Sequence, residues 1–363
     1  MRVLIAPDKF AGTLTAVEAA EAIAAGWRRH APDDELDLAP MADGGPGFVD
    51  VLHAALGGDV HGVVVEGPHG TEVPATILRV DETAYIESAQ ACGLHLAADA
   101  ESPAQFGTTL GVGELVAAAV DGGATRVVVG LGGSGTNDGG AGLLDALGAT
   151  SDGILDCGPA VFGNLTEVDL TPARERLAGV ELVMASDVDN PLTGLFGATK
   201  TFGPQKGLTE EQLPVVDGWL ELLALAVDRR TALEKGAGAA GGLGYALLCL
   251  GATRVPGIEM VADAVRLRER AGAADLVLTG EGAFDFSSRS GKVPYGVAEI
   301  AADALRPCVA LAGQVLVGAR EMRALGVESA YSLVDLVGLE QAMADPGGSL
   351  ERLAARVART WSH

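Results

Sequence analysis

Near the middle of the chain the sequence reads Val127-Val128-Val129-Gly130-Leu131-Gly132-Gly133-Ser134-Gly135-Thr136-Asn137-Asp138-Gly139-Gly140-Ala141-Gly142. The three valines are typical of the end of a buried β-strand, because β-branched side chains pack well on a pleated sheet. Seven of the thirteen residues from 130 to 142 are glycine, and the four non-glycine residues at the centre are polar. Glycine loses the most backbone entropy on folding, so such a cluster needs a structural reason. We expect a loop whose backbone N–H groups approach phosphate or a small polyol, with a long surface turn as the alternative.

Three glycines of this loop, Gly130, Gly132 and Gly135, match the pattern G-x-G-x-x-G of dinucleotide-binding folds. That motif needs a helix to begin inside it, so that the pyrophosphate caps the helix N-terminus. Residues 136–140 make a poor first helical turn, and a helix is plausible only from about Ala141. The sequence therefore disfavours a dinucleotide fingerprint. It also has no P-loop, no G-x-S-x-G nucleophile elbow and no H-x-x-x-H zinc pair.

The composition indicates large apolar cores and excludes several classes of partner. Of the 363 residues, 48% are hydrophobic and only 4% are aromatic, so Ala, Val and Leu must form the cores. No apolar run approaches the roughly 20 residues that span a bilayer. The formal net charge of −24 disfavours nucleic acid and anionic membranes as partners. The four cysteines form no C-x-x-C pair, which is typical of proteins in a reducing compartment, so we expect a cytoplasmic protein. A homo-oligomer is possible.

Both ends of the chain alternate short strands with helices. We expect two N-terminal and three C-terminal strands, at residues 2–6, 36–39, 275–279, 308–312 and 330–333. After the first of these strands, Thr15 and Glu18 form a capping box that begins a helix. This order predicts one five-stranded parallel sheet, with ligands at the carboxyl ends of its strands.

From about residue 59 the pattern changes to short strands joined by Gly and Pro turns. Residues 60–65, 73–80 and 83–87 are typical of an antiparallel meander. The predicted fold class is therefore α/β, with a Rossmann-like or flavodoxin-like parallel-sheet domain and an inserted second α/β domain. We expect the first domain to comprise residues 1–58 and 274–363 and the inserted one residues 59–273, with a cleft between them.

Acidic residues recur where strands are expected to end, and lysines stand beside them. The acidic residues are Asp8, Asp43, Asp138, Asp187, Asp189, Glu281 and Asp285, and the lysines are Lys9, Lys206 and Lys292. Phosphoryl transfer uses this mixture, because phosphates need N–H donors and a lysine, Mg²⁺ needs carboxylates, and the acceptor hydroxyl needs a base. Any single aspartate could equally serve a turn or a helix cap. A hydride-transfer enzyme is the alternative, but the dinucleotide-binding motif that such an enzyme needs is disfavoured above.

Several segments in the same order resemble the glycerate kinase type 1 family, the two-domain glycerate kinases. The resemblance covers essentially the whole length and rests on Ala6-Pro7-Asp8 with Phe10, Gly12 and Leu14, Ala42-Asp43-Gly44-Gly45, Gly132-Gly133-Ser134, Thr136-Asn137-Asp138-Gly139-Gly140, Ser186-Asp187-Val188-Asp189-Asn190-Pro191-Leu192, Phe202-Gly203-Pro204-Gln205-Lys206-Gly207, Gly238-Ala239-Ala240-Gly241-Gly242-Leu243-Gly244, Thr279-Gly280-Glu281-Gly282, Asp285 and Gly291-Lys292. It implies ATP-dependent phosphorylation of D-glycerate to phosphoglycerate, with Mg²⁺.

From residue type and segment we assign expected roles within this resemblance. Asp187, Asp189 and Lys9 are the expected catalytic residues, and the two aspartates are the expected Mg²⁺ ligands or general base. The expected substrate-binding or phosphate-binding residues are Asp8, Asp43, Ser134, Asn137, Asp138, Lys206, Glu281, Asp285 and Lys292.

The chain departs from the family pattern at four positions. The family usually has Lys or Arg where this chain has Ala11, and Glu and Thr where it has Pro46 and Phe48. It often has Arg where this chain has Ala283. Lys9 could replace the cation at position 11, and Arg289 could cover for position 283. A kinase for a related hydroxy-acid or polyol, and a non-catalytic paralogue that binds such a ligand, are the alternative functions.

Overall fold

The structure is a computed structural model that describes residues 1–10, 12–97, 103–285 and 292–362. Contacts divide the chain into two units. The first comprises Met1–Asp43, Asp50–Leu56 and Pro256–His363, and the second Gly44–Val49 and Gly57–Val255.

A five-stranded parallel sheet forms the centre of the first unit, which confirms the sheet predicted from both chain ends. Its order is β13 (Ser329–Ser332), β12 (Cys308–Val315), β11 (Leu276–Phe284), β1 (Arg2–Ile5) and β2 (Glu35–Leu38). In the central pair, Val3 lies opposite Leu276 and Ile5 lies opposite Leu278. Residues 273 apart in the sequence thus lie on neighbouring strands, and the carboxyl ends of all five strands lie along one edge.

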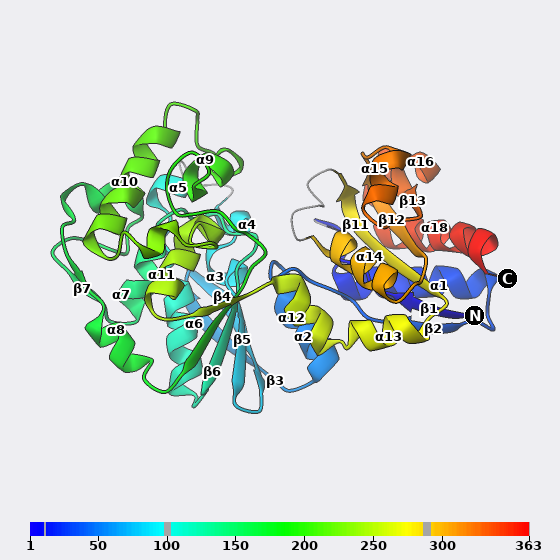
Figure 1. Ribbon diagram of the computed structural model, residues 1–363, viewed down its shortest axis with the longest axis horizontal. Coiled ribbons are helices and arrows are strands. Elements are labelled where there is room, and N and C mark those ends of the chain that lie inside the picture. Colours follow the sequence, from blue (N-terminus) through cyan, green and yellow to red (C-terminus); the bar gives the residue numbers. More distant parts are fainter. Residues whose placement is uncertain (11, 98–102, 286–291, 363) are drawn as a thin grey trace. The chain divides into compact units, whose positions relative to one another are not determined.

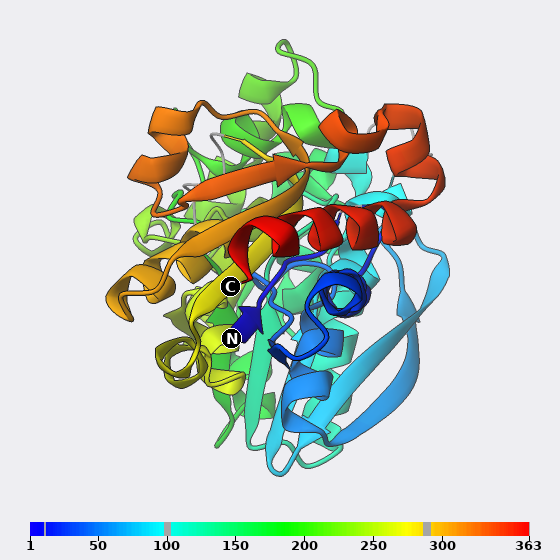
Figure 2. The same ribbon diagram turned by 90° about the vertical axis from the view of Figure 1, so that its right-hand side faces the viewer.

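Helices α1 (Ala16–His30) and α18 (Pro346–Trp361) lie side by side on this unit (Figures 1 and 2). Thr15 and Glu18 form the predicted capping box at the start of α1. A side chain at Gly26 would overlap the backbone of Glu351, so glycine permits the close approach of the two helices. The unit's other helices are α2 (Phe48–Leu56), α12 (Gly257–Ala264), α13 (Leu267–Ala273), α14 (Val293–Asp303), α15 (Ala319–Ala324), α16 (Leu333–Val337) and α17 (Leu339–Ala344).

A six-stranded mixed sheet forms the centre of the second unit. Its order is β10 (Thr253–Val255), β9 (Glu181–Ala185), β6 (Arg126–Gly130), β5 (Thr83–Glu87), β4 (Glu72–Val80) and β3 (Asp59–Glu66). The pairs β3–β4 and β4–β5 are antiparallel, which confirms the predicted meander, whereas β5, β6, β9 and β10 are parallel neighbours. Strands β7 (Thr150–Ser151) and β8 (Val168–Asp169) form a separate small pair.

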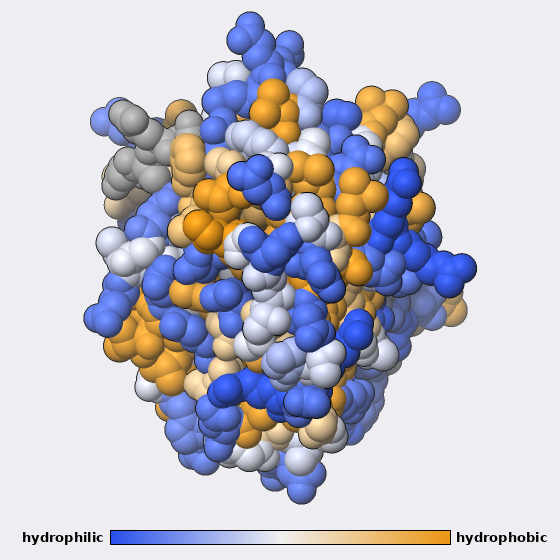
Figure 3. All heavy atoms as spheres, turned by 90° about the vertical axis from the view of Figure 1, so that its left-hand side faces the viewer, coloured by the Kyte–Doolittle hydropathy of each residue, from blue (hydrophilic) through white to orange (hydrophobic). Residues whose placement is uncertain are grey.

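The helices of the second unit surround this sheet and are mostly short. They are α3 (Ala89–Cys92), α4 (Leu94–Ala97), α5 (Pro103–Phe106), α6 (Leu110–Asp121), α7 (Ala141–Ala146), α8 (Thr171–Arg176), α9 (Ala198–Phe202), α10 (Leu213–Ala226) and α11 (Leu243–Cys249), with 3₁₀ turns at Pro159–Asn164, Pro204–Lys206, Thr231–Leu233 and Ala239–Gly242. Helix α7 begins at Ala141, as predicted from the poor helical turn before it. On one face of this unit, apolar residues lie in small groups separated by hydrophilic ones (Figure 3).

The segment 256–273 packs with the first unit, although we expected it in the inserted domain. Its helices α12 and α13 contact α14, and α13 also contacts β1. The division also passes through α2, because Phe48 and Val49 belong to the second unit and Asp50–Leu56 to the first. We therefore propose a domain boundary between Val255 and Pro256 in place of one at 273. No described helix is both long and apolar enough to cross a membrane.

Candidate active site

In the first unit the candidate residues follow the carboxyl ends of neighbouring strands. Asp8 lies just after β1, and its backbone N–H donates to the Gly280 carbonyl at 2.8 Å, which places it beside Glu281 of β11. Asp8 is buried, with 6% of the residue exposed, and so is Glu281. Strand topology therefore gathers two buried carboxyl groups that are 273 residues apart in the sequence.

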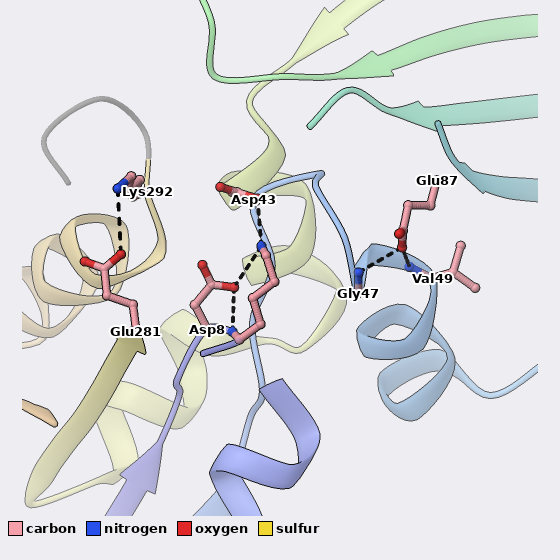
Figure 4. Close-up of polar contacts among 8 residues, drawn as sticks. Asp8, Asp43, Gly47, Val49, Glu87, Glu281 and Lys292 are labelled. Atoms are coloured by element: carbon pink, nitrogen blue, oxygen red, sulfur yellow. Dashed lines mark hydrogen bonds and ion pairs between the residues drawn. The ribbon is translucent and has the colours of Figure 1, made fainter. Parts of the chain in front are cut away.

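The Lys9 ammonium group lies between the carboxylates of Asp8 and Asp43. Lys9 Nζ is 3.6 Å from Asp8 Oδ1 and 3.9 Å from Asp43 Oδ1 (Figure 4). The Lys9 backbone N–H also donates to Asp8 Oδ1, at 2.7 Å. Burial raises the pKa of the Asp8 carboxyl to about 7; the Lys9 ammonium opposes this rise, and the carboxylates of Asp43 and Glu281 reinforce it.

A second lysine lies at the start of α14. Lys292 Nζ is 3.9 Å from Glu281 Oε2 (Figure 4). It is also 3.7 Å from Asp285 Oδ1. These pairs offset the unfavourable placement of a cation at a helix N-terminus. Six side chains at this sheet edge are charged when ionised. They comprise four carboxyl groups, of Asp8, Asp43, Glu281 and Asp285, and two ammonium groups, of Lys9 and Lys292. Among them, negative charge is therefore in excess when all are ionised.

In the second unit the glycine-rich loop lies against a second backbone segment. A Cβ at Gly130 would lie 2.6 Å from the Gly44 carbonyl oxygen, and one at Gly132 would lie 2.7 Å from the Gly45 nitrogen. One at Gly133 would lie 2.8 Å from Pro46 Cδ. We expected these glycines to admit a ligand, but at these three positions they admit the turn 44–46, because no side chain fits between the two backbones.

Asp138 stabilises the loop from inside. Its Oδ2 accepts hydrogen bonds from the Thr109 N–H at 2.8 Å, the Thr109 hydroxyl at 2.7 Å and the Gly142 N–H at 3.2 Å. Its Oδ1 accepts one from the Gly140 N–H at 3.0 Å, and the side chain is fully buried. Burial raises the pKa of this carboxyl, and the four hydrogen bonds oppose the rise. Both oxygens are engaged, so the geometry favours a structural role over the expected ligand contact.

Asn137 also points into the protein interior. Its Nδ2 donates to the Thr199 hydroxyl at 2.9 Å, and the residue has no exposed surface. Its Oδ1 is buried without a hydrogen-bond partner among the described residues. Asn137 therefore links the glycine-rich loop to α9.

Ser134 and Lys206 line a pocket of about 270 Å³ in the second unit. Lys206 is 3% exposed, and its Nζ donates to the Ser134 hydroxyl at 2.9 Å and to the Thr136 carbonyl at 2.6 Å. Burial lowers the pKa of this ammonium to about 8, while Cys92 and Asp138 oppose the shift. A buried lysine beside a glycine-rich loop is suited to an anionic ligand.

The two expected metal ligands, Asp187 and Asp189, both follow β9 but differ in exposure. Asp189 is exposed, and its carboxylate lies 3.2 Å from Lys235 Nζ and 2.7 Å from Arg254 Nη2. The hydrogen bond from Lys235 and the Arg254 guanidinium together lower the pKa of Asp189. A carboxylate paired with two cations is a poor base and a poor metal ligand, so this geometry disfavours the expected assignment. The role of Asp187, which is half-buried, stays a prediction.

Sequence reasoning missed one buried carboxylate, Glu87 at the end of β5. Its Oε2 accepts from the Gly47 N–H at 2.9 Å and the Val49 N–H at 3.5 Å, at the start of α2 (Figure 4). The sequence pattern could have identified Glu87, because it is an acidic residue at the end of an expected strand, like the acidic candidate residues chosen on that ground.

Of the departures from the family pattern, Pro46 lies in the turn 44–46 and Phe48 is the first residue of α2. Pro46 packs on Gly133, and Phe48 is fully buried against Gly130, with an edge-on ring contact to Tyr85 at 6.5 Å. Both residues therefore fill space. Position 283 lies in β11, and Ala11 and Arg289 lie outside the described residues.

Comparisons with known proteins agree over the whole chain. Residues 3–362 match the glycerate kinase family. The glycerate kinase of Bacillus subtilis is 40% identical over 99% of this chain and 97% of its own, and the glycerate 2-kinase of Escherichia coli is 37% identical over 99% and 98%. The crystal structure of a Salmonella typhimurium LT2 protein, provisionally assigned as glycerate kinase 2, superposes with a TM-score of 0.81 at 37% identity and covers 99% of this chain and 98% of its own. The chain belongs to the glycerate kinase family.

Proposed function

We propose that this protein transfers the γ-phosphoryl group of ATP to a hydroxyl group of D-glycerate, giving phosphoglycerate and ADP. The observation that carries the proposal is the family match over residues 3–362, with full-length relatives named glycerate kinase and glycerate 2-kinase. The name of the Escherichia coli relative favours the 2-hydroxyl as the acceptor. The use of ATP fits a cytoplasmic location.

Asp8 is our proposed general base. In the reaction a bond forms between the acceptor oxygen and phosphorus, the bond to the ADP oxygen breaks, and the hydroxyl proton needs an acceptor. A carboxyl group with a pKa of about 7 suits this task, because it ionises near neutral pH and still binds a proton there. Lys9, in contact with both Asp8 and Asp43, would neutralise charge on the substrate or on the transferring group.

The edge that carries Asp8 also fits Mg²⁺, which the glycerate kinase resemblance implies. Among the described residues no three His, Cys, Asp or Glu side chains form a ready-made metal cage. Mg²⁺ commonly takes only one or two carboxylates and completes its shell with water and substrate phosphates. Asp43 or Asp285, each partly exposed and each beside one lysine, would supply such a carboxylate. When bound, Mg²⁺ neutralises phosphate charge.

A kinetic assay tests the function directly. Release of ADP from MgATP is measured with D-glycerate, L-glycerate, glycerol or no acceptor, and the product is assigned as 2- or 3-phosphoglycerate by ³¹P NMR. We expect turnover with D-glycerate that EDTA abolishes and excess Mg²⁺ restores. Faster turnover with another hydroxy-acid or with glycerol would replace the proposed substrate. Tight binding of D-glycerate without ADP release would instead indicate the non-catalytic paralogue.

A further inference from the structure

The ammonium group of Lys206 is buried without an ionic partner. An ammonium has three N–H donors, and Lys206 uses two of them, toward the Ser134 hydroxyl and the Thr136 carbonyl. Both partners are neutral, and in the described part of the chain no carboxylate lies within ion-pair distance of Lys206. A buried charge is costly unless it is paired, so this arrangement favours an anion as the third partner.

The nearby carboxylate of Asp138 does not fill this place. It is close enough to influence Lys206, but its two oxygens accept hydrogen bonds from Thr109, Gly140 and Gly142. Cys92, the other titratable group that acts on Lys206, has its thiol pKa raised to about 12 by burial, so it is neutral at physiological pH. Gly241 leaves room at the ammonium, because a Cβ there would lie 2.9 Å from Lys206 Nζ.

The pocket beside Lys206 fits a small anion better than a nucleotide. Its volume of about 270 Å³ is below the range of roughly 300–1,000 Å³ that is usual for drug-sized ligands. Lys206 is the one cation among its lining residues, whereas the triphosphate of ATP carries several negative charges. A three-carbon acid carries a single carboxylate. Ser134 and Gln205 of the lining add groups that can bind its hydroxyls, and Leu94, Leu131 and Phe202 close the apolar side.

We infer that this pocket is the subsite for the acceptor acid and that Lys206 binds its carboxylate. This inference rests on the proposed function, because it names which of the two substrates the pocket holds. The nucleotide would then bind elsewhere. The inference also explains why a lysine rather than an apolar residue lies in this interior position.

Binding measurements without turnover test the inference. The dissociation constant of D-glycerate is measured by calorimetry in the absence of ATP, and that of ADP is measured separately. The variants are Lys206→Met, which removes the ammonium group and keeps an unbranched side chain, and Lys200→Met as the matched control. Lys200 lies on α9 of the same unit but pairs with Asp217 at 3.2 Å. We expect Lys206→Met to weaken glycerate binding at least tenfold, as for loss of a charge-assisted hydrogen bond, with ADP affinity changed less than twofold.

A second measurement does not depend on the stability of a variant. As pH rises through about 8, Lys206 loses its proton, whereas the glycerate carboxylate stays ionised. In the wild-type protein the dissociation constant for glycerate should therefore rise between pH 7 and pH 9.5. The dissociation constant for neutral glycerol should not rise in the same way.

The outcomes separate this inference from the proposed function. Loss of ADP affinity in Lys206→Met with glycerate affinity retained would show that the pocket holds phosphate and would overturn the inference. A glycerate dissociation constant that is constant from pH 7 to pH 9.5 would also overturn it. Absence of glycerate binding to the wild-type protein would contradict the proposed function itself.

Discussion

At the residue scale, function and stability make opposite demands on Asp8. Its pKa is about 7 in the folded protein, against an ordinary value of 3.8. Between these two values the unfolded chain has lost the proton that the folded protein still holds. The folded state therefore loses stability as pH rises toward 7, and above that pH it holds a buried carboxylate at full cost.

Replacing Asp8 tests both sides of this conflict. Asp8→Asn should lower kcat by about 10²-fold or more, the lower range for a positioned base. It should also raise the melting temperature at pH 8 more than at pH 5, because asparagine resembles the protonated form. Asp303→Asn, which alters an exposed pair with Arg268, is the matched control. Unchanged kcat in Asp8→Asn would remove Asp8 from the mechanism.

Lys9 should act on the same proton. Its ammonium lowers the pKa of Asp8, so Lys9→Met should move the acidic limb of the kcat–pH profile to higher pH. The variant should also raise KM for glycerate or ATP about tenfold, the effect of one charge-assisted hydrogen bond. If Lys9 replaces the cation that the family has at position 11, adding Ala11→Lys should recover part of the loss. A pH profile identical to that of the wild type would show that Lys9 does not tune Asp8.

At the element scale, the turn before α2 depends on the glycine-rich loop and on Glu87. Three loop glycines leave room for Gly44, Gly45 and Pro46, and the Glu87 carboxylate accepts N–H groups at the start of the helix. Asp43 directly precedes this turn in the sequence. Packing in the second unit therefore stabilises the turn that follows Asp43 in the sequence.

A methyl group at Gly132 should disrupt this contact. Gly132→Ala would place Cβ in overlap with Gly45 Cα and 2.7 Å from the Gly45 nitrogen, so one of the two backbone segments would have to shift. We expect a loss of about 1–3 kcal/mol in the free energy of unfolding in urea, the usual range for overpacking. Gly163→Ala is the control, because a Cβ there meets nothing within 4 Å. Equal stability of the two variants would mean that the turn yields to the new side chain.

Glu87 should contribute through its two hydrogen bonds. Glu87→Ala leaves the partly buried Gly47 N–H and the buried Val49 N–H without this acceptor and should cost about 1–3 kcal/mol in the free energy of unfolding. Glu87→Gln keeps an acceptor oxygen and should recover much of that loss. If Glu87→Gln is as unstable as Glu87→Ala, the negative charge at the helix N-terminus matters more than the hydrogen bonds.

At the scale of the whole molecule, each unit offers a different chemistry. The first carries several carboxylates and two lysines at its sheet edge, and the second carries a single buried lysine in a small pocket. From the two proposals above we expect the two substrates to contact different units first. This separation also puts lysine ammonium groups at two places in a protein of net charge −24, which otherwise repels anionic substrates.

Hydrogen–deuterium exchange should resolve the two contacts. D-glycerate alone should slow exchange in peptides covering residues 131–138 and 203–207, because ligand binding stabilises the local structure that it contacts. A non-hydrolysable ATP analogue with Mg²⁺ should slow exchange around Asp8 and in residues 280–285. Protection by glycerate confined to the first unit would contradict the separation.

The amino-acid sequence by itself determined the elements and their order. The valines before the glycine-rich loop, the capping box of Thr15 and Glu18, and the start of α7 at Ala141 are local features, because each depends on residues a few positions apart. Alternation of strands and helices then led to the five-stranded sheet, because parallel strands need crossover connections. The glycine-rich loop itself was also evident, but the reason for its glycines was not.

Only the tertiary structure decided what each polar residue does. Asp8, Asp138 and Asp189 are all aspartates in strand-end loops, yet one is buried beside like charges, one is saturated with hydrogen bonds, and one is exposed between two cations. The cations that pair with Asp189 come from positions 235 and 254, and the N–H group that faces Gly132 comes from position 45. Burial and charge pairing depend on distances in space rather than on spacing along the chain. For that reason residue types and order predicted the family's chemistry, whereas the assignment of base, structural carboxylate and anion partner required the folded chain.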